Sequence, residues 1–282
     1  MEASQQRFKN SWSRIDRAKY HLAAFQTEWN RLAKASRSTI TRLDKDSGWY
    51  TASFVVDESL RCAIKMTTLP LILGEYAYQL RAALDGLIWD AITFKQGAEP
   101  ASDAKNVTRL EFPILNGKVR DFNACAFHHF PFPDKLKTWM ESIQPDSAEK
   151  PEGHPDRGLA GALEDIHNLA RFDRHRRLRI VAALPTELYA NIVFDPPEGF
   201  KAVGWEGIPC NILGDEYDLL RFKVESVTGN PPRKIRIETN AKFEIFFEDL
   251  ATYKDLPSGE RLRNLMEAVV YVIRQFESEF AV

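Results

Sequence analysis

The sequence predicts an α+β protein, a bundle of about four long helices with an antiparallel β-sheet and a small β-hairpin inserted between helices. Two observations lead to this fold class. Apolar residues recur at spacings of three and four along several long segments, which is the pattern of helices that bury one face. The regions 48–66 and 186–250 are rich in β-branched and aromatic residues, which is typical of strands.

The helical pattern has clear starts and stops. Long helices are expected over 5–36, 71–95, 156–183 and from Ser258 onward, with a shorter one over 134–143. Pro70 suits the first turn of the second helix, because the N–H that proline lacks is unsatisfied there in any case. Pro185 ends the third helix, because proline breaks a helix interior.

The strands are expected to form a hairpin and a sheet. In the hairpin, 48–56 pairs with 60–66 across a short polar stretch. The sheet is built from the segments 187–194, 219–227, 234–239 and 243–248, with Asn240–Ala241 as a candidate tight turn. Alternation predicts one wet face, on which Arg221, Lys223, Lys234 and Arg236 point away from Leu220, Phe222, Ile235 and Ile237.

This order of elements predicts three parts. Residues 1–185 form a helical bundle, which contains the hairpin at 48–66 and an irregular insertion at 107–157. Residues 186–250 form the antiparallel β segment, either packed against the bundle or as a lobe of its own. Residues 257–282 form a terminal helix that returns to the bundle.

The composition excludes some classes of protein. A net charge of −2 gives no general nucleic-acid signature. The three cysteines are odd in number and far apart, which disfavours a disulfide framework and indicates a reducing compartment. The polar start and the lack of a long apolar run indicate a cytoplasmic protein with no membrane partner.

The segment Leu159–Arg179 combines an apolar face with a strongly basic one. The basic residues are His167, Arg171, Arg174, His175, Arg176, Arg177 and Arg179. Asp173 falls on the apolar face, where a charge costs several kcal/mol unless it is paired. Asp173 is therefore expected to pair with Arg177, one turn further on, or with a residue of another helix.

Arginine and histidine at this spacing suit a phosphate group. Arginine binds two phosphate oxygens at once, and histidine moves a proton near neutral pH. The alternative is a solvated basic helix end, which interacts favourably with the helix dipole.

Arg81 and Asp85 lie one turn apart on the second helix. Such a pair adds a few tenths of a kcal/mol to a helix. The functional alternative is that Arg81 faces the third helix and its cluster of Asp173, Arg174 and His175.

Other motifs give weaker indications of function. Cys125, His128 and His129 resemble metal ligands, but no second cluster has the spacing of a metal site, so no metal and no cofactor is expected. The aromatic residues of 127–132 are expected to form a hydrophobic plug between lobes. The sequence contains no phosphate-binding glycine loop and no nucleophile motif, so a small-molecule enzyme has no support.

Two short segments carry a resemblance. LRAALDGLIW (80–89) resembles the "LRSALDHL" helix of an uncharacterised bacterial family, and HNLARFDRHR (167–176) resembles its "NIDKHR" helix. The order of elements agrees over roughly 5–185. The family pattern is similar to the HEPN ribonuclease motif, in which Arg and His from paired subunits face an RNA phosphate. Arg81 matches the arginine, and Gly86 stands where the family has histidine.

The resemblance implies a HEPN-like nucleic-acid-associated protein of a bacterial stress or defence system, either a metal-independent ribonuclease or its degenerate relative. RNA, a second copy of the chain or another protein is the expected partner. The candidate residues are Arg81, Arg171 and His175 for catalysis, His167, Arg174, Arg176, Arg177 and Arg179 for phosphate binding, and Asp85 and Asp173 for a structural polar cluster. The alternative is a non-catalytic protein-interaction or structural module.

Overall fold

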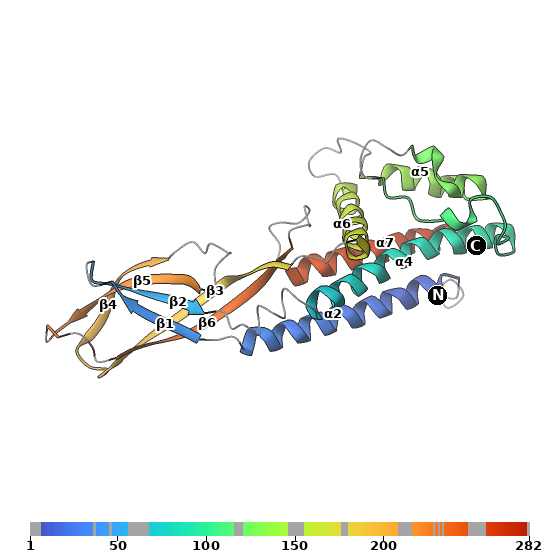
Figure 1. Cartoon of the computed structure of the whole chain (residues 1–282). Helices are drawn as coiled ribbons and strands as arrows, with labels where there is room; N and C mark the ends of the chain where they lie inside the picture. The colour runs from blue at the N-terminus through green and yellow to red at the C-terminus, as the bar shows by residue number, and fades with distance from the viewer. Residues whose placement is uncertain are drawn as a thin grey trace. The chain divides into compact units, whose positions relative to one another are not determined.

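The computed structural model is a mixed α+β protein (Figure 1). It describes residues 7–35, 38–44, 47–55, 68–115, 121–145, 155–175, 180–207, 216–227, 229–230, 232, 234–247 and 258–280. The helices are α2 (Lys9–Ala35), α4 (Thr68–Gln96), α5 (Asp134–Ser142), α6 (Pro155–His175) and α7 (Ser258–Glu279). The strands are β1 (Ser38–Leu43), β2 (Trp49–Val55), β3 (Ile180–Asp195), β4 (Phe200–Gly207), β5 (Glu216–Ser226) and β6 (Lys234–Phe247).

The chain forms two compact units. A helical unit comprises Met1–Gln26, Pro70–Leu178 and Asp249–Val282. A β unit comprises Thr27–Leu69 and Arg179–Glu248.

The helical unit is held together by α2, α4 and α7. The Ser11 hydroxyl of α2 donates to the Ala83 carbonyl of α4 over 2.8 Å. Trp12 Nε1 donates to Glu277 of α7 over 2.8 Å, and the Tyr76 hydroxyl of α4 donates to a carbonyl of α7. These helices therefore pack pairwise in the core.

The predicted bundle of about four long helices is not confirmed. Helix α6 contacts α7, but in Figure 1 it crosses α4 and α7 instead of running along them. Both helices bury an apolar face, as their spacing predicts: Leu84 and Leu87 of α4 and Leu163 and Ile166 of α6 are completely buried.

The prediction that the third helix reaches residue 183 was wrong. Helix α6 ends at His175, and Ile180 begins β3. A short continuous apolar run such as 180–184 fits a helix or a strand equally well by periodicity, and pairing with β6 decides for the strand. Pro185 is accommodated beside a register shift in this pairing.

The hairpin also differs from the prediction. Trp49–Val55 pairs with Ser38–Leu43, the segment before it, and 56–67 lies outside the described residues. Thr39, Ile40 and Thr41 give β1 the β-branched side chains that favour a strand. Gly48 adopts φ 68° at the turn, which glycine tolerates without strain.

The β unit contains two antiparallel sheets, where the sequence predicted one. The hairpin of β1 and β2 forms one side of a four-stranded sheet with the order β1-β2-β5-β4. Strands β3 and β6 pair in a second sheet. The predicted turn at Asn240–Ala241 is absent, because both residues continue the β6 ladder opposite Tyr189 and Leu188. Because the ladder continues, the backbone N–H and C=O groups of these residues are hydrogen-bonded between strands, whereas a turn would leave some of them unpaired.

The inner and outer faces of the strands were predicted correctly. Ala52, Leu220, Phe222 and Ile237 form a buried core between strands of the two sheets. Arg221, Lys223, Lys234 and Arg236 are exposed, as alternation requires. Arg221 and Lys223 belong to the first sheet, however, and the other two belong to the second.

Candidate functional site

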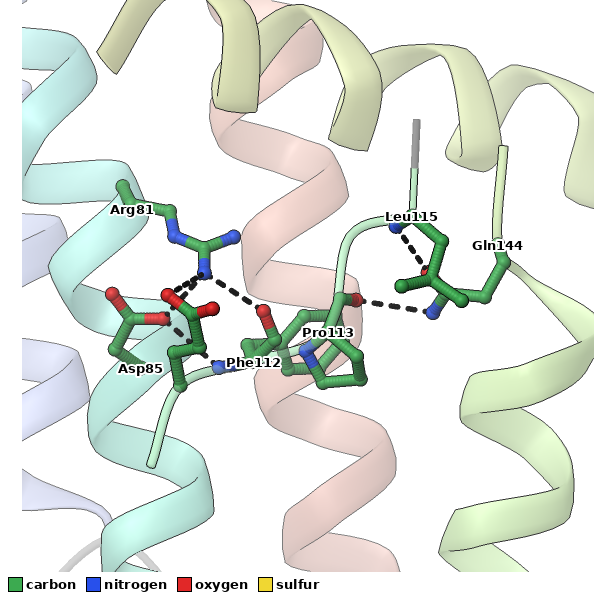
Figure 2. Close-up of polar contacts among 7 residues, drawn as sticks. Arg81, Asp85, Phe112, Pro113, Leu115 and Gln144 are labelled. Carbon is green, nitrogen blue, oxygen red and sulfur yellow. Dashed lines mark hydrogen bonds and ion pairs between the residues drawn. The ribbon is translucent and has the colours of Figure 1, made fainter. Parts of the chain in front are cut away.

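Arg81 of α4 is a buried arginine that binds a neighbouring peptide segment (Figure 2). Its Nη2 atom donates to the Phe112 carbonyl over 2.8 Å and lies 3.0 Å from Asp85 Oδ1. Glu111 Oε2 lies 3.5 Å away. Its Nη1 atom is buried without a hydrogen-bond partner in the described part of the chain.

Asp85 completes this contact. Residues four apart lie on the same side of a helix, so Asp85 reaches the same segment and accepts the Phe112 N–H over 2.9 Å. Burial raises the pKa of the Asp85 carboxyl, a shift that the Arg81 guanidinium and the Phe112 N–H oppose. The pair therefore binds both backbone groups of one residue.

Gln144, just after α5, binds the same segment further along. Its Oε1 accepts the Leu115 N–H over 2.9 Å, and its Nε2 donates to the Pro113 carbonyl over 3.1 Å. Figure 2 shows Arg81 and Asp85 at one end of this segment and Gln144 at the other. The Phe112 side chain is completely buried beside the Phe276 ring of α7. We call 111–115 the clamped segment.

This geometry identifies what the Arg81–Asp85 pair does in the fold. The clamped segment belongs to no helix or strand, so its backbone N–H and C=O groups need side-chain partners once they are buried. Arg81, Asp85 and Gln144 supply them. An arginine that is 4% exposed has no free face for a large external anion.

Gly86 lies at the contact between α4 and α2. A Cβ atom at this position would lie 3.2 Å from Ser11 Oγ. That hydroxyl is fixed by its hydrogen bond to Ala83, so it cannot move away without losing a buried contact. The close approach of α2 therefore favours glycine at this position.

The basic end of α6 is only partly described. His167 is half-buried and Arg171 is exposed. Asp173, Arg174 and His175 belong to α6, but their side chains lie outside the description, as do residues Arg176, Arg177 and Arg179 altogether. Of the predicted site residues, the structure brings together Arg81 and Asp85.

Sequence reasoning missed several buried polar residues. Asp165 of α6 and Arg261 of α7 are 1% and 3% exposed, and Gln144 is also buried. Asp165 could have been found by the spacing that singled out Asp173, because it lies three residues after Ala162 and four before Leu169. No comparable signal exists for Gln144, which binds a segment about thirty residues away.

Two further groups have shifted titrations. Burial raises the pKa of Asp90 on α4 to about 6, and Glu99 adds to this shift. Burial lowers the pKa of His21 on α2; Arg17 lowers it further, and Glu75 opposes the shift. No sequence pattern indicates either shift, since both depend on how deeply the folded chain buries these side chains.

The aromatic segment after 121 is part of the core of the helical unit. Phe127 is buried against Phe122 and Phe132, and Phe132 in turn contacts Phe276 of α7. It is therefore a hydrophobic plug within one unit and not between lobes. Across the part of the chain that the structure describes, no group of three or more potential ligands could hold a metal ion.

None of the described helices is both long and apolar enough to span a membrane. Comparison with protein-family models, curated proteins and solved structures finds no match for this chain.

Proposed function

We propose that this chain is a HEPN-like nucleic-acid-associated protein that binds RNA and does not cleave it, the degenerate relative of a metal-independent ribonuclease in a bacterial stress or defence system. The observation that carries the loss of cleavage is the burial of Arg81. Its guanidinium is engaged by Asp85 and by the Phe112 carbonyl, so it is not available to an RNA phosphate.

The chemistry of RNA cleavage supports the same conclusion. Without a metal ion, cleavage needs one group that accepts the proton of the 2′-hydroxyl and another that protonates the leaving oxygen. Glycine at position 86 can do neither, and a Cβ added there would lie 3.2 Å from Ser11 Oγ, so a larger side chain would have to displace that hydroxyl. A catalytic role for Arg171 and His175 would then need a second copy of the chain or a different arrangement of residues.

The proposed binding site for RNA is the basic end of α6. Five arginines occur within 171–179, and Arg171 is exposed. Such a density of positive charge in a chain with net charge −2 is a local feature that complements a phosphate backbone. His167 lies one turn before Arg171 on the same helix and is half-buried.

Fluorescence anisotropy with a labelled single-stranded RNA tests the proposal. Each phosphate contact contributes about −0.7 to the slope of log affinity against log salt, so three contacts give about −2. Arg174→Ala combined with Arg176→Ala should flatten this slope, and by similar amounts for different RNA sequences, because phosphate contacts carry no sequence information. Arg263→Ala with Arg274→Ala, two exposed arginines of α7, is the matched control.

The second candidate is a non-catalytic protein-interaction module. The observation that favours it is a pair of aromatic side chains at the surface, Tyr271 of α7 (46% exposed) beside Trp139 of α5. Absence of RNA binding at low salt, together with a molar mass above that of one chain in light scattering, would favour this candidate over the first.

A further inference from the structure

A second group of basic residues lies on α2. Within 7–31, six arginines and lysines stand against two acidic residues. Both acids are already paired within the helix, Asp16 with Lys19 at 2.9 Å and Glu28 with Arg31 at 2.7 Å. Arg14 and Arg17 form no salt bridge among the described residues, and Glu75 of α4 is the carboxylate that acts on the neighbouring His21, so the cluster keeps an excess of positive charge.

Two exposed tyrosines accompany these arginines. Tyr20 of α2 is 62% exposed, and the Arg17 guanidinium lies over its ring at 5.0 Å. Tyr78 of α4 is 45% exposed, and the Arg14 guanidinium lies 6.0 Å from its ring centre. We call Arg14, Arg17, Tyr20 and Tyr78 the Arg–Tyr face.

The face is held in place by neighbouring contacts. Arg14 Nη1 donates to Gln79 Oε1 of α4 over 3.0 Å, which ties the two helices together at this point. The buried His21 ring packs edge-on against Tyr20 at 5.6 Å. Exposed aromatic rings that are fixed in this way lose little conformational freedom when a ligand stacks on them.

The geometry points to single-stranded nucleic acid as the partner of the Arg–Tyr face. Exposed aromatic rings stack on unpaired bases, arginines bind phosphates, and this combination is what sequence-tolerant single-strand binding requires. Double-stranded RNA does not offer unstacked bases, and a surface of carboxylates alone offers charge without rings to stack on. This inference rests on the proposed function and adds a second contact to it.

The test compares two double variants in the full chain. A fluorescein-labelled oligouridine of about 20 nucleotides, long enough to cover more than one contact, is titrated at several salt concentrations. Tyr20→Leu with Tyr78→Leu should weaken binding by about tenfold or more with an unchanged salt slope. Arg14→Ala with Arg17→Ala should reduce the slope by about 1.4, the contribution of two phosphate contacts.

The controls separate this inference from the proposed function. Tyr271→Leu removes a tyrosine of similar exposure elsewhere in the helical unit, and Arg263→Ala with Arg274→Ala removes the same charge. If only Arg174→Ala with Arg176→Ala weakens binding, the inference fails and the proposed function stands. If only the variants of the Arg–Tyr face weaken binding, the basic end of α6 is not the RNA site and the inference stands.

The remaining outcomes would overturn the inference or both proposals. Equal weakening by the control variants would show a general charge effect and overturn the inference. The inference would also be overturned if the variants of the Arg–Tyr face lost binding to polyglutamate or to anionic phosphatidylserine vesicles as strongly as they lost binding to RNA, because neither probe offers bases for stacking. A wild-type chain that binds no RNA at low salt would overturn both proposals.

Discussion

Replacing Asp85 with alanine tests whether the Arg81–Asp85 pair is structural. The substitution leaves the Arg81 guanidinium buried without its closest carboxylate, and it removes the acceptor of the Phe112 N–H. Breaking a buried pair typically costs about 3–5 kcal/mol. Asp85 is 33% exposed and Glu111 remains 3.5 Å from Arg81, so we expect a loss of about 2–3 kcal/mol.

Thermal unfolding followed by circular dichroism measures this loss. In a domain of this size, each kcal/mol shifts the melting temperature by about 2–4 °C, so Asp85→Ala should lower it by about 4–12 °C. Glu111→Ala is the control and should shift it by less than about 2 °C, because its side chain is 53% exposed and at a longer distance.

A double-mutant cycle makes the test specific. Arg81→Met combined with Asp85→Leu removes both charges, so no unpaired buried charge remains and part of the loss should be recovered. The structural account would be refuted by a melting temperature that Asp85→Ala leaves unchanged within about 2 °C. It would also be refuted if the effects of the single variants Arg81→Met and Asp85→Leu simply added in the double variant.

Three other substitutions test residues of α2 and α4 outside the Arg81–Asp85 pair. Gly86→His should lower the melting temperature more than Gly86→Ala does, because the larger side chain starts from a Cβ 3.2 Å from Ser11 Oγ, and it should create no ribonuclease activity while Arg81 stays buried. Asp90 binds its proton more tightly in the folded protein than in the unfolded one, so it reduces stability above its pKa of about 6. Asp90→Asn should therefore raise the free energy of unfolding in urea by on the order of 1–2 kcal/mol at pH 7.5, and by little near pH 4; equal gains at both values would contradict this. Burial lowers the pKa of His21, so the wild-type chain should lose stability as the pH falls below 6.5, and His21→Gln should lose less between about pH 7 and 5 in thermal unfolding.

Local signals in the sequence were enough for several elements. The position of Pro70 and the apolar spacing that follows predicted α4, and the apolar spacing after Ser258 predicted α7. Alternation predicted which side chains of β5 face the core, because a strand fixes the side on which each residue lies. These features depend on residues that are close together along the chain.

The elements that were missed depend on distant partners. The segment 180–184 is apolar in either a helix or a strand, and only its pairing with β6, more than fifty residues away, selects the strand. The residues 49–55 have β-rich neighbours on both sides, and periodicity does not say which of them is the partner. Strand β4 contains Gly204 at φ 64°, against the Trp49 ring, which interrupts the alternation that would have revealed it.

The candidate site shows the same division. The spacing of Arg81 and Asp85 predicted their ion pair. Their shared target, Phe112, follows from the path of the clamped segment, which no local pattern encodes. Asp173 is still a prediction, because its side chain lies outside the description.

Incubation of a labelled single-stranded RNA with the protein in EDTA at low salt, with binding and RNA length followed in the same sample, tests the central claim most directly. The account predicts RNA that is bound and stays intact. Metal-independent cleavage of the RNA that disappears in His175→Ala, a variant that leaves the contacts of Arg81 with Asp85 and Phe112 in place, would contradict it.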